Sequence, residues 1–205
     1  MNSLSKYIRQ RFNISLWCLV AIMLIALSLK EFSISLVHVY SIPFVLFFLF
    51  TMRLFDDLAS AKIDSEDANR DYTNEVTKKE LQTILIISQI VLISILAFFD
   101  MERAVNLFFF LVFNTILYYL LFNVSKFRHF LPLLKYPFVI YILNLEPSFN
   151  LIAVYVAFVI FEMLEDPLFP NYLLTNYKAA IPDKKIIPYL FLLLFLLTQI
   201  ILKNV

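Results

Sequence analysis

The chain of 205 residues contains no glycine. Glycine-rich phosphate loops and the glycine-dependent dinucleotide fingerprint are therefore excluded. A single cysteine, Cys18, excludes an intramolecular disulfide framework. Charged residues are also scarce, at 16% of the chain, and the formal net charge is +1. No basic field therefore indicates a nucleic acid as partner.

Apolar residues are abundant instead. They make up 61% of the chain, with 23 phenylalanines among them, which excludes an ordinary soluble domain. A helix that crosses a bilayer needs roughly 17–25 mostly apolar residues. We expect an all-α fold, a polytopic transmembrane bundle of about seven helices that forms one integral membrane domain over residues 1–205. The candidate spans are about 13–30, 33–52, 81–99, 104–122, 129–145, 149–165 and 186–203.

The basic residues predict the orientation of this bundle. With a cytoplasmic N-terminus, 14 of the 17 Lys and Arg residues fall on the cytoplasmic side, and only Lys30, Arg103 and Lys203 fall outside. This distribution follows the positive-inside rule. We expect a multi-pass protein of a bacterial plasma membrane, in contact with membrane lipid, with long cytoplasmic acidic loops at about 53–80 and 162–185.

The first acidic segment, "RLFDDLASAKIDSEDANRD", directly follows an apolar run. If the preceding helix continues through it, a rotation of about 100° per residue places Arg53, Asp57, Ser60 and Asp64 on one stripe. Asp56 lies at the edge of that stripe. Two or three carboxylates are then expected at the cytoplasmic end of the bundle.

The second acidic segment, "FEMLEDP", has the same position relative to a later apolar run. Glu162, Glu165 and Asp166 share a helix face, and Pro167 is expected to end the helix. Glu162 follows "LIAVYVAFVIF" and is expected within the hydrocarbon boundary, where an ionisable residue is costly and is a functional candidate.

Two clusters of carboxylates, one from each acidic segment, are expected on the same side of the bundle. Such an arrangement suits Mg²⁺, which binds oxygen ligands and often combines one or two carboxylates with substrate phosphates. A metal-bound diphosphate is a good leaving group. Arg53, Arg70 and Lys135 would bind the remaining phosphate oxygens. Aromatic-rich helices would house an apolar tail and stabilise an allylic cation. The pattern predicts prenyl transfer, while solvated helix ends and a snorkelling Lys135 remain the structural alternatives.

The segment "RLFDDLASAKIDSEDANRDYTNEVTKKEL" resembles the first aspartate-rich region of the UbiA-type prenyltransferase superfamily. Asp56, Asp57 and Asp64 match its acidic positions, and "ANR" at 68–70 matches the segment around its arginine. "FEMLED" resembles the second acidic motif. The order of helices and motifs agrees over about residues 10–185.

The resemblance implies a helical bundle with a metal-bound diphosphate at its cytoplasmic mouth. It implies transfer of an isoprenyl group from its diphosphate to a lipophilic, aromatic acceptor, with Asn69 and Arg70 binding the diphosphate. No catalytic base is assigned. The expected Mg²⁺ ligands are Asp56, Asp57, Asp64, Glu162 and Asp166.

Two alternatives stay open. Ser60 stands where the family has a further aspartate, and about seven helices are expected where the family usually has nine. These departures favour a non-catalytic UbiA-like scaffold or binding protein, with a partner subunit or a second copy of the chain completing the bundle. The other alternative is a transporter, unrelated to prenyl chemistry, that uses Glu162 in ion or proton passage. Trp17, Tyr118 and Tyr119 are expected to pack or to line the membrane interface.

Overall fold

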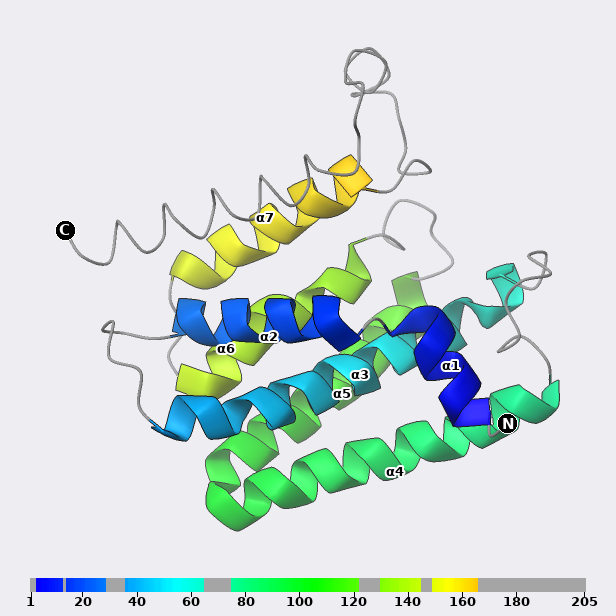
Figure 1. Ribbon diagram of the computed structural model, residues 1–205, viewed down its shortest axis with the longest axis horizontal. Helices are drawn as coiled ribbons and strands as arrows, with labels where there is room; N and C mark the ends of the chain where they lie inside the picture. Colours follow the sequence, from blue (N-terminus) through cyan, green and yellow to red (C-terminus); the bar gives the residue numbers. More distant parts are fainter. Residues whose placement is uncertain are drawn as a thin grey trace.

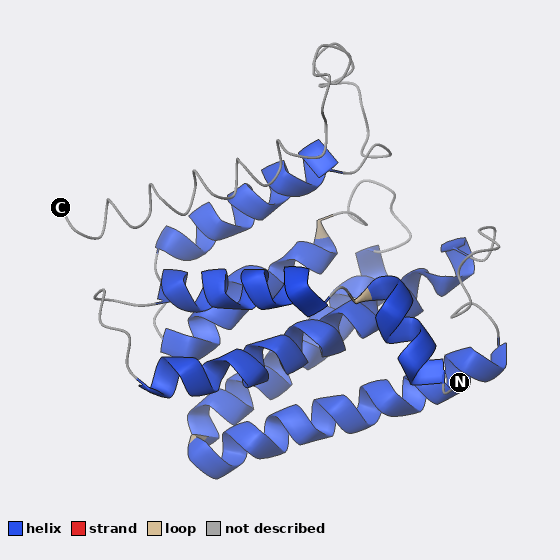
Figure 2. Cartoon of the chain, viewed as in Figure 1, coloured by secondary structure: helices blue, strands red, loops and turns tan. Residues whose placement is uncertain are grey.

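The computed structural model describes residues 3–12, 14–28, 36–64, 75–121, 130–144 and 149–165. Within these ranges the chain is helical and has no strand (Figures 1 and 2), which confirms the all-α prediction for this part. The elements are α1 (Ser3–Arg11), α2 (Ile14–Ser28), α3 (Leu36–Asp64), α4 (Glu75–Phe99), α5 (Met101–Leu121), the 3-10 helix η2 (Leu131–Leu134), α6 (Lys135–Asn144) and α7 (Phe149–Glu165).

Helices α4 and α5 form an apolar hairpin with a one-residue break at Asp100. The Asp100 carboxylate accepts the backbone N–H of Arg103 at 3.2 Å, so it is the N-cap of α5. Thr77–Phe99 and Met101–Leu121 are long and apolar enough to cross a membrane, and only 22% and 28% of their apolar windows are buried. Their outward surfaces therefore suit contact with lipid.

The other described helices are shorter or more polar. α2 has 15 residues and α6 has 10, fewer than the roughly 17–25 that a span requires, and α7, with 17, reaches only the lower limit of that range. The described part thus contains two helices able to cross a membrane, or three if α1 and α2, which meet at a bend of 70°, count as one. The seven-span bundle stays a prediction, and the span expected at 186–203 lies outside the described residues.

Helix α3 is longer than the span expected at 33–52, because it continues to Asp64 over 29 residues. Residues 53–64 were expected to begin the cytoplasmic loop, with a continued helix as the alternative. The structure shows that they are helical. Residues 75–80 belong to α4 and residues 162–165 to α7. Each acidic segment therefore begins within a helix, α3 or α7, whose earlier apolar residues pack in the core.

One apolar core joins α2 through α7. Leu24, Phe48, Leu92, Leu107 and Phe158 are almost fully buried in it. Figure 1 shows α3 running between α2 and the α4–α5 hairpin, with α6 beside α2 and α7 beyond it. This arrangement brings the later part of α3 close to α1, α5 and the start of α6.

The end of the bundle at the α4–α5 turn is fixed by side chains that bind helix termini. Arg103 Nη1 donates to the carbonyl of Leu143 at 2.8 Å, and Asn144 Nδ2 donates to the carbonyl of Ser28 at 2.6 Å. These bonds satisfy carbonyls at the C-terminal ends of α6 and α2, which have no partner within their own helices. In Figure 1 this turn and α1 lie at opposite ends of the bundle.

Candidate functional site

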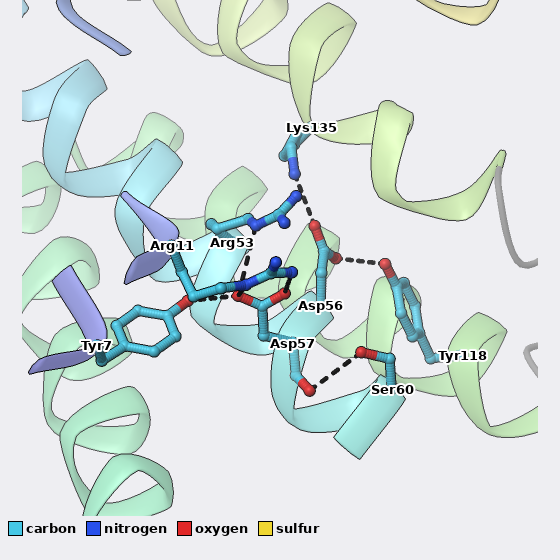
Figure 3. Close-up of polar contacts among 8 residues, drawn as sticks. All are labelled: Tyr7, Arg11, Arg53, Asp56, Asp57, Ser60, Tyr118 and Lys135. Carbon is cyan, nitrogen blue, oxygen red and sulfur yellow. Dashed lines mark hydrogen bonds and ion pairs between the residues drawn. The ribbon is translucent and has the colours of Figure 1, made fainter. Parts of the chain in front are cut away.

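Two adjacent carboxylates, Asp56 and Asp57, lie on the later part of α3 and are almost completely buried, with 7% and 3% of their surface exposed. Neighbouring residues on a helix project about 100° apart. The two carboxylates consequently point to different sides of α3, and each binds partners from different elements (Figure 3).

Asp56 binds the residue that begins α6. Lys135 Nζ lies 2.6 Å from Asp56 Oδ2, and the Tyr118 hydroxyl from α5 donates to the other carboxylate oxygen. The ammonium group also lies 5.8 Å from the ring centre of Trp17 and 5.5 Å from that of Tyr136, within cation–π range. Lys135 is only 2% exposed. It is therefore a buried ion-pair partner and does not snorkel to the interface.

Asp57 binds α1. Arg11 donates to both of its oxygens, from Nη2 at 2.7 Å and from Nε at 3.2 Å, a two-point geometry that favours a guanidinium over an ammonium. The Tyr7 hydroxyl donates to Oδ2 at 2.8 Å. Tyr7 and Arg11 are about one helical turn apart on α1, so this one carboxylate binds two successive turns of α1 and holds the helix against α3.

Arg53 is the third cation beside these carboxylates, and its Nε is not hydrogen-bonded within the described residues. This buried nitrogen lies 3.4 Å from Asp57 Oδ2, close enough for an ion pair. We call Arg11, Arg53, Asp56, Asp57 and Lys135, with the hydroxyls of Tyr7 and Tyr118, the ionic cluster. It combines three cations with two carboxylates, so one positive charge is in excess.

The Asp57 carboxylate lies outside the two apolar spans, α4 and α5. Burial by itself raises its pKa, but the charge of Arg53 and the hydrogen bonds and charge of Arg11 outweigh burial. The pKa of Asp57 is therefore below its ordinary value, and this carboxylate is ionised at neutral pH.

Ser60 occupies the position where the UbiA-type motif has a further aspartate. Its hydroxyl donates to the backbone carbonyl of Asp57 at 3.1 Å. Ser60 thus makes a local helix bond of the kind serine commonly makes, and it contributes no charge to the cluster.

For the remaining predicted site residues, the structure describes the backbone alone, or the residues lie outside its described ranges. Asp64 ends α3 and Glu162 lies in the last turn of α7, but their side chains fall outside the description. Asn69, Arg70 and Asp166 lie outside the described residues altogether. In the ranges that are described, no three His, Cys, Asp or Glu side chains gather to hold a metal ion. The five-carboxylate Mg²⁺ set therefore remains a prediction.

An aromatic layer lies deeper in the bundle. Phe48 of α3 and Phe110 of α5 have ring centres 6.3 Å apart, and Phe138 of α6 stacks on Phe110 at 3.7 Å. Phe48 precedes Asp56 by eight residues, or about 12 Å along the helix. The three helices that carry Asp56, Tyr118 and Lys135 thus also supply an aromatic interior below them.

Three members of the cluster were not identified from the sequence as site residues. Tyr118 was expected to pack, Arg11 was counted only among the cytoplasmic basic residues, and Tyr7 was given no role. A signal for Tyr118 existed, because it ends the buried stripe of α5 that includes Leu107, Leu111 and Asn114. Nothing in the sequence pattern relates α1 to Asp57.

Comparisons of the chain with protein-family models, with curated proteins and with solved structures find no match. The likeness to UbiA-type prenyltransferases therefore depends on the motif residues of "RLFDDLASAKIDSEDANRD" and "FEMLED" alone.

Proposed function

We propose that this chain is a membrane-embedded prenyltransferase of UbiA type. In this proposal it moves an isoprenyl group from its diphosphate to a lipophilic acceptor and depends on Mg²⁺. The observation that carries the proposal is the ionic cluster, which has one excess positive charge and lies about two helical turns from an aromatic layer on the same three helices. An isoprenyl diphosphate has the matching chemistry, since an anionic head is joined to an apolar tail.

The ion pairs of the cluster would exchange partners when such a ligand enters. Lys135, Arg11 and Arg53 would turn from carboxylates to diphosphate oxygens, for which guanidinium and ammonium groups are good donors. Arg53 needs the smallest change, because its Nε makes no hydrogen bond with the described residues. An exchange of this kind leaves no buried charge without a partner, which would otherwise be strongly destabilising.

The carboxylates released in this exchange fit Mg²⁺, which takes oxygen ligands and commonly shares them with a phosphate. Asp56 and Asp57 would hold it, and the motif adds Asp64, Glu162 and Asp166. The metal would supply charge neutralisation on the departing diphosphate. The chain's own residues would hold the head group, orient the tail between α3, α5 and α6, and exclude water from the reacting carbon.

The aromatic layer suits the apolar end of the ligand. Phe48, Phe110 and Phe138 come from three different helices and meet below Asp56. Their rings would pack against the apolar chain of the isoprenyl group beyond its diphosphate-bearing carbon. The tail would then extend toward the lipid-facing helices α4 and α5.

The test is Mg²⁺-dependent release of diphosphate from geranyl diphosphate by the detergent-purified chain. A panel of phenols and other lipophilic alcohols would serve as acceptors. We expect Asp57→Asn and Asp64→Asn to abolish release while both variants still insert into membranes. Full activity in both variants would contradict the proposal. As a control, Asp100→Asn changes an aspartate at the opposite end of the bundle and should keep its activity.

A second candidate is a non-catalytic membrane protein that binds the same lipid anion. It is favoured by Ser60, which supplies no carboxylate where the family motif has an aspartate, and by the engagement of Asp56 and Asp57 with cations. This candidate predicts binding of geranyl diphosphate without Mg²⁺ and no release of diphosphate with any acceptor. A partner subunit or a second copy would then complete the assembly.

A further inference from the structure

Asn114 is a polar residue deep inside an apolar span. It lies in the second half of α5 and is 2% exposed. In the described structure its side-chain oxygen, Oδ1, is buried and has no hydrogen-bond partner. Buried side-chain oxygens almost always have a partner, and leaving one unpaired in hydrocarbon is costly. The exception calls for a donor that the described chain does not supply.

The register of α3 and α5 locates Asn114 within the bundle. Asp56 bonds Tyr118 across a separation of 62 positions, and Phe48 faces Phe110 with the same separation. The two helices therefore run in the same direction and in step. Asn114 lies midway between the two contacts, at the level of Met52, which is buried and has no donor to offer.

The residues one helical turn before and one turn after Asn114 on α5 belong to the aromatic layer and to the ionic cluster. One turn further along α5, Tyr118 belongs to the ionic cluster, and its ring packs edge-on against Phe55 at 4.8 Å. One turn earlier, Phe110 belongs to the aromatic layer. An unpaired acceptor thus lies between a charged head-group region and a stack of aromatic rings.

We infer that Asn114 is a binding residue for a lipophilic molecule that carries a hydroxyl or N–H donor. The donor would bond Asn114 Oδ1, and the apolar body of the molecule would lie against the aromatic layer of Phe48, Phe110 and Phe138. Within the proposed function, on which this assignment to a substrate depends, that molecule is the prenyl acceptor. Its nucleophilic oxygen or nitrogen would be held one helical turn from the cluster that binds the diphosphate.

The inference is tested with a matched pair of probes, para-hexylphenol and its methyl ether, which differ only in the hydroxyl donor. Their affinities are measured for the full chain in nanodiscs, with protein-free nanodiscs as background. We expect the phenol to bind at least about tenfold more tightly than the ether, because only the phenol pairs Oδ1. In Asn114→Leu, which keeps the branched shape of the side chain and removes the acceptor, the ratio should fall to about one.

The control is Thr115→Val, which removes a hydroxyl from the neighbouring, outward-facing position of α5, where it bonds the Leu111 carbonyl. This variant should keep the wild-type ratio. Asn114→Met provides a second apolar replacement if the leucine variant does not fold. Equal affinities of the wild type for phenol and ether, or an unchanged ratio in both Asn114 variants, would overturn the inference and assign Asn114 to helix packing.

Binding of geranyl thiodiphosphate, measured in the same nanodiscs, separates this inference from the proposed function. Asn114→Leu should retain that binding, since Asn114 is not part of the ionic cluster. If the wild type fails to bind the diphosphate but keeps an Asn114-dependent preference for the phenol, the donor site stands and the prenyltransferase proposal fails. If the diphosphate binds and the preference is absent, the reverse holds.

Discussion

Lys135 Nζ lies 2.6 Å from Asp56 Oδ2, and both side chains are buried although 79 positions separate them in the chain. The pair joins the first residue of α6 to the later part of α3. A buried ion pair of this kind stabilises a fold less than its Coulomb attraction suggests, because both charges lose water. Its integrity is nevertheless essential, because removing one partner leaves a buried charge alone.

A double-mutant cycle tests this relationship. Lys135→Met and Asp56→Leu should each lower the free energy of unfolding by about 3–5 kcal/mol, and the double variant should be more stable than either single one. Thermal unfolding in detergent, followed by circular dichroism, measures the effect. Additive losses in the double variant would mean that the two charges do not interact.

The Tyr118 hydroxyl should contribute to stability through Asp56. Tyr118→Phe removes a bond to a buried carboxylate and should cost about 1–3 kcal/mol. Tyr119→Phe is the matched control, because Tyr119 is 84% exposed on the same helix and should cost almost nothing. Equal unfolding temperatures for the two variants would refute the assigned role of Tyr118.

Arg11 should hold α1 against α3. Arg11→Gln loses both bonds to Asp57, so the backbone amides of α1 should exchange hydrogen about tenfold faster or more than in the wild type. Arg9→Gln changes an exposed arginine of the same helix and should leave exchange unchanged. Hydrogen exchange read by mass spectrometry compares the two. Protection of α1 that is equal in both variants would show that another contact positions α1.

The ion pairs of Asp57 should make stability depend on pH in the acidic range. The pKa of Asp57 is below its ordinary value in the folded chain, so its contribution is fully present above the unfolded-state pKa of about 3.9. The contribution is lost as pH falls through the folded-state pKa. The unfolding temperature of the wild type should therefore decline below about pH 4, and that of Asp57→Asn should decline less steeply. Parallel pH profiles would argue against ionisation of Asp57 in the folded state.

The sequence was sufficient to predict the helices that are decided by local pattern. The apolar runs expected at 81–99 and 104–122 correspond to the spans Thr77–Phe99 and Met101–Leu121, because no glycine or proline interrupts them. Residues 53–80 were expected in a loop, and the continuation of α3 past residue 52 was only a condition for placing Arg53 and Asp57 on one stripe; the structure meets that condition, and the i,i+4 ion pair of these two residues agrees with it. These features depend on neighbours a few positions apart.

The pairings of the site could not be predicted in the same way. Asp56 and Asp57 are adjacent, and helical geometry separates their directions but does not name their partners. Lys135 and Arg11, at separations of 79 and 46 positions, reach them only because α6 and α1 pack against α3. The unpaired oxygen of Asn114 is likewise a property of the packed bundle, since a single asparagine in an apolar run has no periodic signature.

The ionic cluster as a diphosphate site is tested most directly by binding of geranyl thiodiphosphate, which resists ionisation. Affinity for the detergent-purified chain would be measured by calorimetry with and without Mg²⁺. The wild type should bind only with Mg²⁺, and Asp57→Asn and Arg53→Gln should each weaken binding at least tenfold, while Arg103→Gln, at the opposite end of the bundle, should not. No binding in either condition, or equal affinities across all three variants, would contradict the account.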